Sequence, residues 1–192
     1  MMKLRDMMYI SLFAAIVGVL GFFPPIPLPF SPVPITAQTL GVMLAGGILG
    51  ARRGGLSLLL FIILVAIGTP LLSGGRGGLG PLLGPGGGYI ISWPIAAWTI
   101  GYLVEKSWNK LSLWKILLYN VLGGILLIYA GGVTYLSIAG NLPWLPTAIS
   151  ALAFLPGDLT KAVVSSYITW KISKAYPLIT PKKHQQPIKR VG

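Results

Sequence analysis

The sequence predicts an all-α integral membrane protein with six transmembrane helices. Two observations lead to this fold class. The composition is 54% hydrophobic and only 9% charged, whereas a soluble domain carries about 25% charged residues. The apolar residues also gather in windows that reach the roughly 17–25 residues needed for a membrane span, and the charges fall between these windows. A very apolar soluble core does not account for windows of that length.

Six apolar segments are expected to form the spans. They are Met7–Phe23, Ile35–Ala51, Leu56–Leu72, Tyr89–Val104, Trp114–Leu136 and Thr147–Trp170. The first segment follows Lys3 and Arg5, as in a signal peptide, but no small-residue cleavage site and polar region come after it. We therefore expect a retained first helix. Residues 1–176 should form one membrane domain, and residues 177–192, with the single His184, a basic cytoplasmic tail.

The basic residues predict how these spans are oriented. When six spans are assumed, all but two of the 15 Lys and Arg residues fall on one side. The exceptions are Arg76, on the opposite side, and Lys161, inside the last span. Cytoplasmic loops carry an excess of Lys and Arg, so both termini are expected to be cytoplasmic. The net charge of +12 is therefore expected to face anionic lipid at the membrane surface, and it does not indicate nucleic-acid binding.

Two connections on the predicted outer side have unusual compositions. Half of residues 23–34 are proline, which excludes a helix and predicts an extended apolar strap. Residues 73–88 are mostly glycine, and glycine lets the backbone approach a ligand closely. Long loops are usually functional, so we favour a loop that covers a ligand over a plain connector.

Asp158 and Lys161 are the strongest candidates for a binding site. Both lie inside the last apolar segment, where a charged side chain costs about 2.5–3.5 kcal/mol and by default marks a functional site. Their spacing places them on one helix face, which Ser165 continues. Pro156 and Gly157 predict that a helix starts or breaks there, so that Asp158 can cap the next turn. The alternative is an ion pair that only neutralises itself.

Other polar residues are weaker candidates. Thr36 and Gln38 begin the second span and offer hydrogen-bonding groups to a ligand, or else cap the helix and face the interface. Tyr89 stacks on a ligand or belongs to an aromatic belt, and the role of Asn120 in the fifth span stays open. Arg76 either draws an anionic substrate to the outer mouth or is a solvated loop charge.

Small residues mark one face of the first helix. They are Ser11, Ala14, Ala15 and Gly18, within an arc of about 100° on a helix of 3.6 residues per turn. Small residues at four-residue spacing let another helix come close in a membrane. We expect a partner-interface here, with a helix of the same chain as the alternative.

The sequence lacks the residues of several other classes of protein. It contains no cysteine and one histidine, which leaves no catalytic triad and no metal site of the usual His and Cys ligands. Its three acidic residues lie far apart. The glycine-rich segment has no lysine and does not match a P-loop, so the chain is not expected to hydrolyse ATP by itself. We predict a protein that is not an enzyme.

Four motifs, taken in this order, resemble the BioY family. They are PVPITAQTLGVMLAG, LGARRGG, GTPLLSGG with GPGGGYIISW, and LPGDLTK. The resemblance implies a six-helix component that captures biotin from outside a prokaryotic cell membrane. It also implies that a transmembrane coupling protein and ATPase subunits of an energy-coupling-factor module act with it, so that ATP is used by the partners and the chain itself needs no cofactor.

The resemblance assigns roles to single residues. Asp158 and Lys161 match the acidic and basic residues of the family's last helix, and Ala14 and Gly18 match its first-helix contact with the coupling protein. The family's polar side chain between the third and fourth spans has only Ser73 and Arg76 as counterparts, so backbone amides near Gly86 and Gly87 are expected to substitute.

The chemistry of biotin fits these residues. A ureido ring offers two N–H donors and one carbonyl, which suit Asp158 and Lys161, and apolar walls suit the bicyclic body. Two alternatives remain: a binding component for another vitamin, and a small membrane enzyme that uses Asp158 and Lys161 for proton chemistry.

Overall fold

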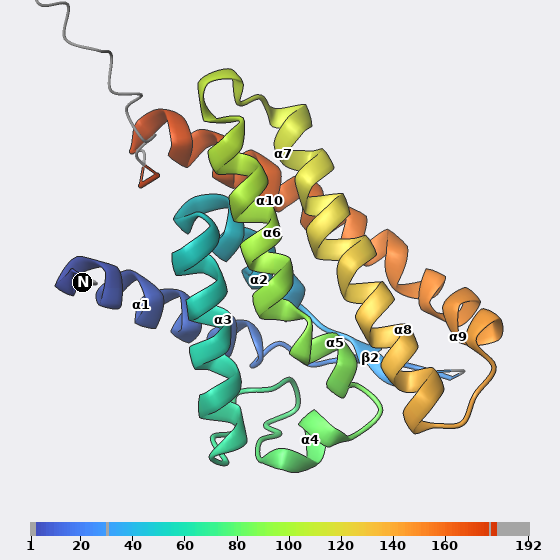
Figure 1. The fold of residues 1–192 in the computed structure, drawn as a ribbon. Coiled ribbons are helices and arrows are strands. Elements are labelled where there is room, and N and C mark those ends of the chain that lie inside the picture. The colour runs from blue at the N-terminus through green and yellow to red at the C-terminus, as the bar shows by residue number, and fades with distance from the viewer. Residues whose placement is uncertain (1–2, 30, 177, 180–192) are drawn as a thin grey trace, which may run out of the picture.

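The computed structural model describes residues 3–29, 31–176 and 178–179, which form a bundle of helices (Figure 1). The α-helices are α1 (Leu4–Leu20), α2 (Gln38–Leu49), α3 (Ala51–Ala66), α4 (Leu79–Leu83), α5 (Gly87–Ile91), α6 (Trp93–Lys106), α7 (Leu113–Tyr119), α8 (Ile128–Ala139), α9 (Trp144–Ala151) and α10 (Leu155–Ala175). A π-helix, Asn120–Leu127, joins α7 to α8. Short 3-10 helices occupy Trp108–Lys110 and Leu152–Phe154.

Each of the six predicted segments contains helix. Leu113–Ala139 and Trp144–Ala175 are continuous helical runs of 27 and 32 residues, long and apolar enough to cross a membrane. The other four segments correspond to α1, α2, α3 and the pair α5–α6, which are shorter. The structure therefore confirms a mostly helical, apolar chain, and the number of spans stays a prediction.

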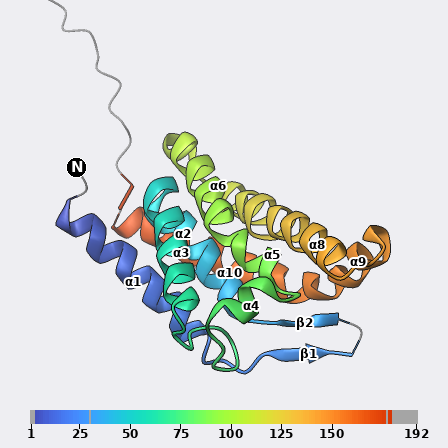
Figure 2. The same cartoon turned by 60° about the horizontal axis from the view of Figure 1, so that its bottom comes forward.

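The proline-rich segment forms a β-hairpin, which departs from the all-α prediction. Strand β1 (Ile26–Leu28) pairs antiparallel with β2 (Ser31–Ile35), with Ile26 opposite Ile35. The segment is extended, as its prolines predict. The hairpin lies across the end of the bundle beside α4 (Figure 2).

The glycine-rich segment is partly helical. It begins with a bridge between Leu72 and Arg76, continues through α4, and reaches α5 at Gly87. Gly74 and Gly75 have φ values of +79° and +69°, which side-chain-bearing residues rarely adopt. Glycine is thus required for the turn that folds this segment over the end of the bundle.

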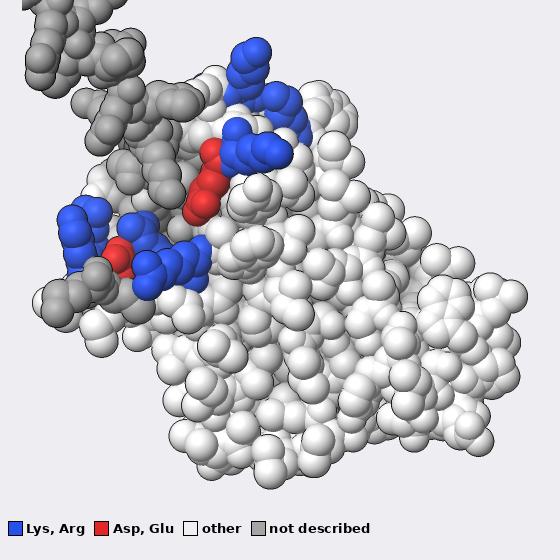
Figure 3. All heavy atoms as spheres, in the orientation of Figure 1, with Lys and Arg blue, Asp and Glu red and all other residues white. Residues whose placement is uncertain are grey.

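Charged side chains cluster around the start of α1 and the connection from α6 to α7, away from the hairpin (Figure 3). Asp6, Arg52, Arg53, Glu105 and Lys106 line one cavity of about 640 Å³ there. Arg53 pairs with Asp6 at 2.9 Å. The charge clusters of the amino terminus, the α2–α3 connection and the end of α6 therefore lie together, as the predicted sidedness requires.

Helix α2 is the centre of the bundle and packs against α1, α3, α6 and α10. Val42, Met43 and Ala45 have no exposed surface. Gly50, with φ +84°, ends α2 and starts α3, and the Ala51 N–H that follows donates to Glu105 Oε1 at 2.9 Å. This sharp turn fixes the central helix against its neighbours and so fixes the position of its polar first turn.

Candidate ligand site

A cavity of about 370 Å³ lies between the hairpin, the glycine-rich segment and the ends of the helices. A small-molecule pocket typically has about 300–1,000 Å³, so the cavity has the size for one small ligand. Six of the residues predicted to bind a ligand line it: Thr36, Gln38, Arg76, Gly86, Tyr89 and Asp158. These residues come from four separate parts of the sequence, and the fold brings them together.

Asp158 is the buried charged residue of this cavity. It is only 4% exposed, and its Oδ1 lies 2.7 Å from Lys161 Nζ. Lys161 Nζ also donates to the Thr36 carbonyl at 2.6 Å and to the Thr39 hydroxyl at 2.9 Å. All three donors of the ammonium group therefore have partners, and the lysine holds the carboxylate in one position.

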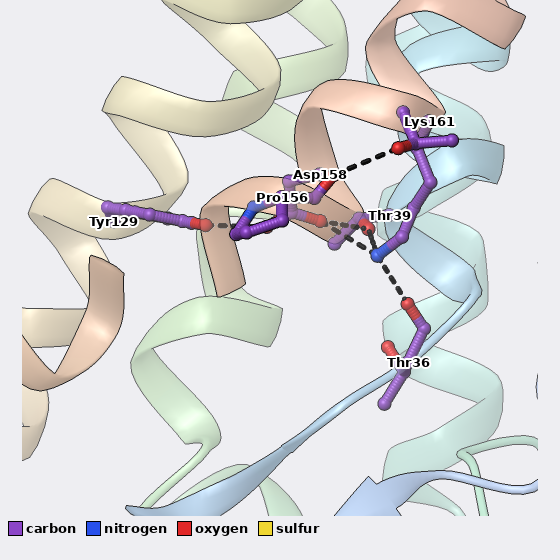
Figure 4. A network of polar contacts seen from close by, with 7 residues as sticks. Thr36, Thr39, Tyr129, Pro156, Asp158 and Lys161 are labelled. Atoms are coloured by element: carbon purple, nitrogen blue, oxygen red, sulfur yellow. Dashed lines mark hydrogen bonds and ion pairs between the residues drawn. The ribbon is translucent and has the colours of Figure 1, made fainter. Parts of the chain in front are cut away.

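Tyr129 approaches the other oxygen of the same carboxylate. Its hydroxyl donates to Asp158 Oδ2 at 2.7 Å, and the Thr39 hydroxyl lies 3.1 Å from Oδ1. Figure 4 shows the carboxylate between Tyr129 on one side and Thr39 with Lys161 on the other. An ionised carboxylate has about four lone-pair positions. With three partners from the chain, it has room to accept one hydrogen bond from a ligand.

The prediction that a helix starts at Pro156 and Gly157 is confirmed, because α10 begins at Leu155. The prediction that Asp158 caps this helix is wrong. The run Trp144–Ala175 is continuously helical, and no side chain caps the start of α10. Pro156 lies in the first turn of α10, where its missing N–H has no helical partner to lose. Because a 3-10 turn carries the chain from α9 into α10, the carboxylate is not needed as a cap and binds side chains instead.

Aromatic side chains form walls of the cavity. Phe154 packs edge-on against both Tyr89 and Tyr129, with ring centroids 6.0 and 6.2 Å apart. Trp93 also lines the cavity and is 4% exposed. Such edge-to-face pairs are favourable and hold the rings in fixed orientations. The cavity thus combines apolar walls with a few polar groups, as is usual for small-molecule sites.

Gln38 is fully buried, at 1% exposed, and does not face an interface. Its Nε2 donates to the carbonyls of Val17 and Leu71 at 3.1 and 3.0 Å. Its Oε1 accepts from the N–H and the hydroxyl of Ser73 at 3.1 and 3.3 Å. The chain itself uses both donors and both acceptor positions of this amide, so Gln38 joins α1, α2 and the glycine-rich segment at the edge of the cavity.

Arg76 is exposed at the cavity, and its Nε donates to the Ser73 carbonyl at 3.1 Å. Its remaining N–H groups can reach an anionic group at the mouth. Gly86 lines the cavity, whereas Gly87 is buried at the start of α5 and is not part of the lining. The glycine-rich segment therefore contributes one charged side chain, Ser73, two prolines and glycine backbone to the site.

Ser165 and Asn120 lie away from the cavity. Both are fully buried and neither is part of the lining. Asn120 Nδ2 donates to the Ala162 carbonyl and to Ser166 Oγ at 3.3 and 3.0 Å. The face of α10 that carries Asp158 is therefore polar well beyond the ligand site, and Asn120 belongs to the contact between two helices.

The small residues of α1 divide between two surfaces. Ala14 and Gly18 are buried, and a Cβ at Gly18 would lie 3.2 Å from Leu71 Cδ2. Ser11 and Ala15 are exposed. Half of the predicted partner-interface thus packs within the chain, as the alternative expected, and the other half remains on the surface.

Sequence reasoning missed Thr39, Tyr129, Phe154 and Trp93 as site residues. Thr39 lies three positions after Thr36, a spacing that would place both on one face of the expected second helix, and so could have been found. No comparable signal marks Tyr129, because a single tyrosine in an apolar span is ordinarily interpreted as a packing residue.

Comparisons with known proteins place these observations in one family. The BioY family model matches residues 1–178. The biotin transporter BioY of Rhizobium etli is 44% identical over 183 residues, covering 93% of this chain and 98% of that protein. The probable biotin transporter BioY of Bacillus subtilis is 45% identical over 178 residues, with 93% and 95% covered.

A solved structure shares the fold. It is described as the S-component for biotin from an ECF-type ABC transporter, and it matches with a TM-score of 0.86 and 36% identity over 91% of this chain and 95% of that one. Together with the two long apolar helices, these relatives identify a membrane protein. The sequence motifs, the helical fold and the relatives agree, and this chain belongs to the BioY family.

Proposed function

We propose that this chain captures biotin at the outer face of a prokaryotic cell membrane and delivers it inward with an ATP-driven energy-coupling module. The observation that carries the proposal is the Asp158 carboxylate, held by Lys161 and Tyr129 at the edge of an aromatic cavity of about 370 Å³. Relatives that are 44% and 45% identical are named as biotin transporters, which supports this ligand over another vitamin.

The polar groups suit the ureido ring of biotin. One ureido N–H can donate to the open position of the Asp158 carboxylate. All three N–H donors of Lys161 are already bonded, to Thr36, Thr39 and Asp158. Lys161 can therefore donate to the ureido carbonyl only if one of these contacts is replaced. The thioether rings would lie against Tyr89 and Phe154, and the carboxylate tail would extend toward the exposed Arg76.

The membrane arrangement is part of the proposal. Six spans with both termini in the cytoplasm place the charged end of the bundle inside and the hairpin outside, consistent with the excess of basic residues at the charged end. Residues 1–176 would form the membrane domain and residues 177–192 a cytoplasmic tail. Apart from residues 178–179, the proposed tail lies outside the described residues.

The partners would be a transmembrane coupling protein and ATPase subunits. The exposed Ser11 and Ala15 on α1 offer a close approach to a partner helix. We propose that the chain carries no cofactor of its own and leaves its ligand chemically unchanged.

A vitamin panel tests the proposal. The purified chain in detergent is titrated with biotin, thiamine, riboflavin and pantothenate, and the bound compound is then recovered and analysed. We expect heat of binding with biotin alone and recovery of intact biotin. Binding of another vitamin would instead make the chain a binding component for that vitamin. Recovery of a modified compound would support the enzyme alternative.

A further inference from the structure

The π-helix Asn120–Leu127 interrupts the helical run from α7 to α8. In an α-helix of 3.6 residues per turn, side chains nine positions apart point to opposite sides, since nine residues make two and a half turns. A π-helix bonds residue i to i+5 and turns less per residue. Asn120 and Tyr129 are nine positions apart, and both contact the same helix, α10.

The contacts on α10 follow a single face. Tyr129 donates to Asp158 at 2.7 Å, while Asn120 donates to the Ala162 carbonyl at 3.3 Å and to Ser166 Oγ at 3.0 Å. Asp158, Ala162 and Ser166 are spaced four residues apart and thus lie above one another. The π-helix therefore aligns two polar side chains that an uninterrupted α-helix would point in opposite directions.

The other side of the π-helix is held by close packing. A Cβ at Gly124 would lie 2.6 Å from Met43 Cε of α2, and one at Gly123 would lie 2.5 Å from Ile100 Cγ1 of α6. Both separations are shorter than real Cβ contacts, so a side chain at either position would require Met43 or Ile100 to shift. The two glycines thus let α2 and α6 pack closely against the π-helix, on the side that does not carry Asn120 and Tyr129 to α10.

We propose that the π-helix sets the register of the ligand site: it directs Tyr129 onto the Asp158 carboxylate as a positioning residue, and Asn120 anchors the same register on α10. This inference rests on the proposed function. Tyr129 binds Asp158 Oδ2, whereas Lys161 binds the other carboxylate oxygen, Oδ1. Asn120 does not line the cavity and acts on the ligand only through this alignment.

A double-mutant cycle on biotin affinity tests the role of Tyr129. Tyr129→Phe removes one hydrogen bond to a charged group and is expected to weaken binding about tenfold. In an Asp158→Asn background the same change should have little further effect, because interacting sites are not additive. Tyr135→Phe is the matched control: its hydroxyl donates to the Leu83 carbonyl from an exposed position, and parental affinity is expected. Independent losses that multiply in the double variant would overturn the positioning role.

A second cycle tests the register. Asn120→Ala should weaken biotin binding about three- to tenfold in the parent but not in a Tyr129→Phe background, while the exposed Asn109→Ala leaves affinity unchanged. An equal loss in both backgrounds would overturn the alignment. If Asn120→Ala does not fold, the Tyr129 cycle decides. A parent that does not bind biotin would defeat the proposed function, whereas a binding parent with an equally tight Tyr129→Phe variant would defeat this inference alone.

Discussion

Lys161 Nζ donates a 2.6 Å hydrogen bond to the backbone carbonyl of Thr36, 125 positions earlier in the sequence. This contact joins α10 to the segment that leaves the hairpin and enters α2. The same ammonium group holds Asp158. A change at the carboxylate, such as binding of a ligand, is therefore linked directly to the end of the hairpin that borders the cavity.

Lys161→Met should cost both stability and ligand binding. Removing one partner of a buried ion pair leaves an unpaired charge and lowers the free energy of unfolding by about 3–5 kcal/mol. Thermal unfolding in detergent measures this loss. The added change Asp158→Asn removes the unpaired charge and should restore most of the stability, but biotin binding should stay lost in both variants.

Lys171→Met is the control for this pair. Lys171 is exposed near the end of α10, so its loss should change neither the unfolding temperature nor affinity. Full biotin binding by the Lys161→Met, Asp158→Asn double variant would mean that the two residues are only a structural pair.

Gln38→Leu should destabilise the fold more than a typical surface change. It removes the hydrogen-bond partner of the buried Val17 carbonyl, of the part-buried Leu71 carbonyl and of the buried Ser73 N–H, and each unsatisfied buried group costs about 1–3 kcal/mol. We expect a lower unfolding temperature that biotin raises by about as much as in the parent. Loss of biotin binding without loss of stability would instead make Gln38 a ligand contact.

Gly132→Ala should narrow the cavity from behind. A Cβ at Gly132 would run into the Tyr89 ring, and the ring would have to move toward the cavity. Such overpacking costs about 1–3 kcal/mol, part of which should appear as weaker biotin binding in calorimetry. In the control Gly157→Ala the new Cβ meets Ile35 at an ordinary 3.6 Å, and an equal loss in both variants would contradict the packing argument.

Arg76→Gln should weaken binding of biotin but not of biotinamide, which lacks the negative charge. Because Arg76 is exposed, the loss should be small, within about 1 kcal/mol or a few-fold in Kd. Added salt should reduce the affinity of the parent toward that of the variant. Equal losses for both ligands would show that Arg76 acts on loop structure, through its bond to Ser73.

The proposed orientation can be measured because the chain contains no cysteine. A single cysteine is introduced at Leu142, exposed between α8 and α9, or at Asn109, exposed between α6 and α7. A membrane-impermeant maleimide should label Leu142→Cys in intact cells and Asn109→Cys only after permeabilisation. The reverse pattern would place both termini outside.

The helical segments could be predicted because apolar runs and charge clusters are local properties of the sequence. Their exact winding could not. Ser92 separates α5 from α6 inside one predicted span, and the π-helix at Asn120 leaves no signal in an apolar sequence. The proline content of residues 23–34 excluded a helix, but the pairing of Ile26 with Ile35 depends on a chain reversal that composition does not specify.

The site was predictable where a polar residue was out of place. Asp158 and Lys161 stand out because charge is costly in an apolar helix. Tyr129 does not stand out, since its role depends on the winding of a helix 29 positions from Asp158. Gln38 was found for its polarity, but only the structure shows that the chain itself uses all of its hydrogen-bonding positions.

Calorimetric titration of the purified chain and of Asp158→Asn with biotin tests the central claim most directly. Asp6→Asn, the same change at the charged end of the bundle, is the control. The account predicts tight binding by the parent and by Asp6→Asn, and binding weakened at least about 100-fold in a folded Asp158→Asn variant, since a buried charged hydrogen-bond partner is lost. Unchanged binding by Asp158→Asn would contradict the account.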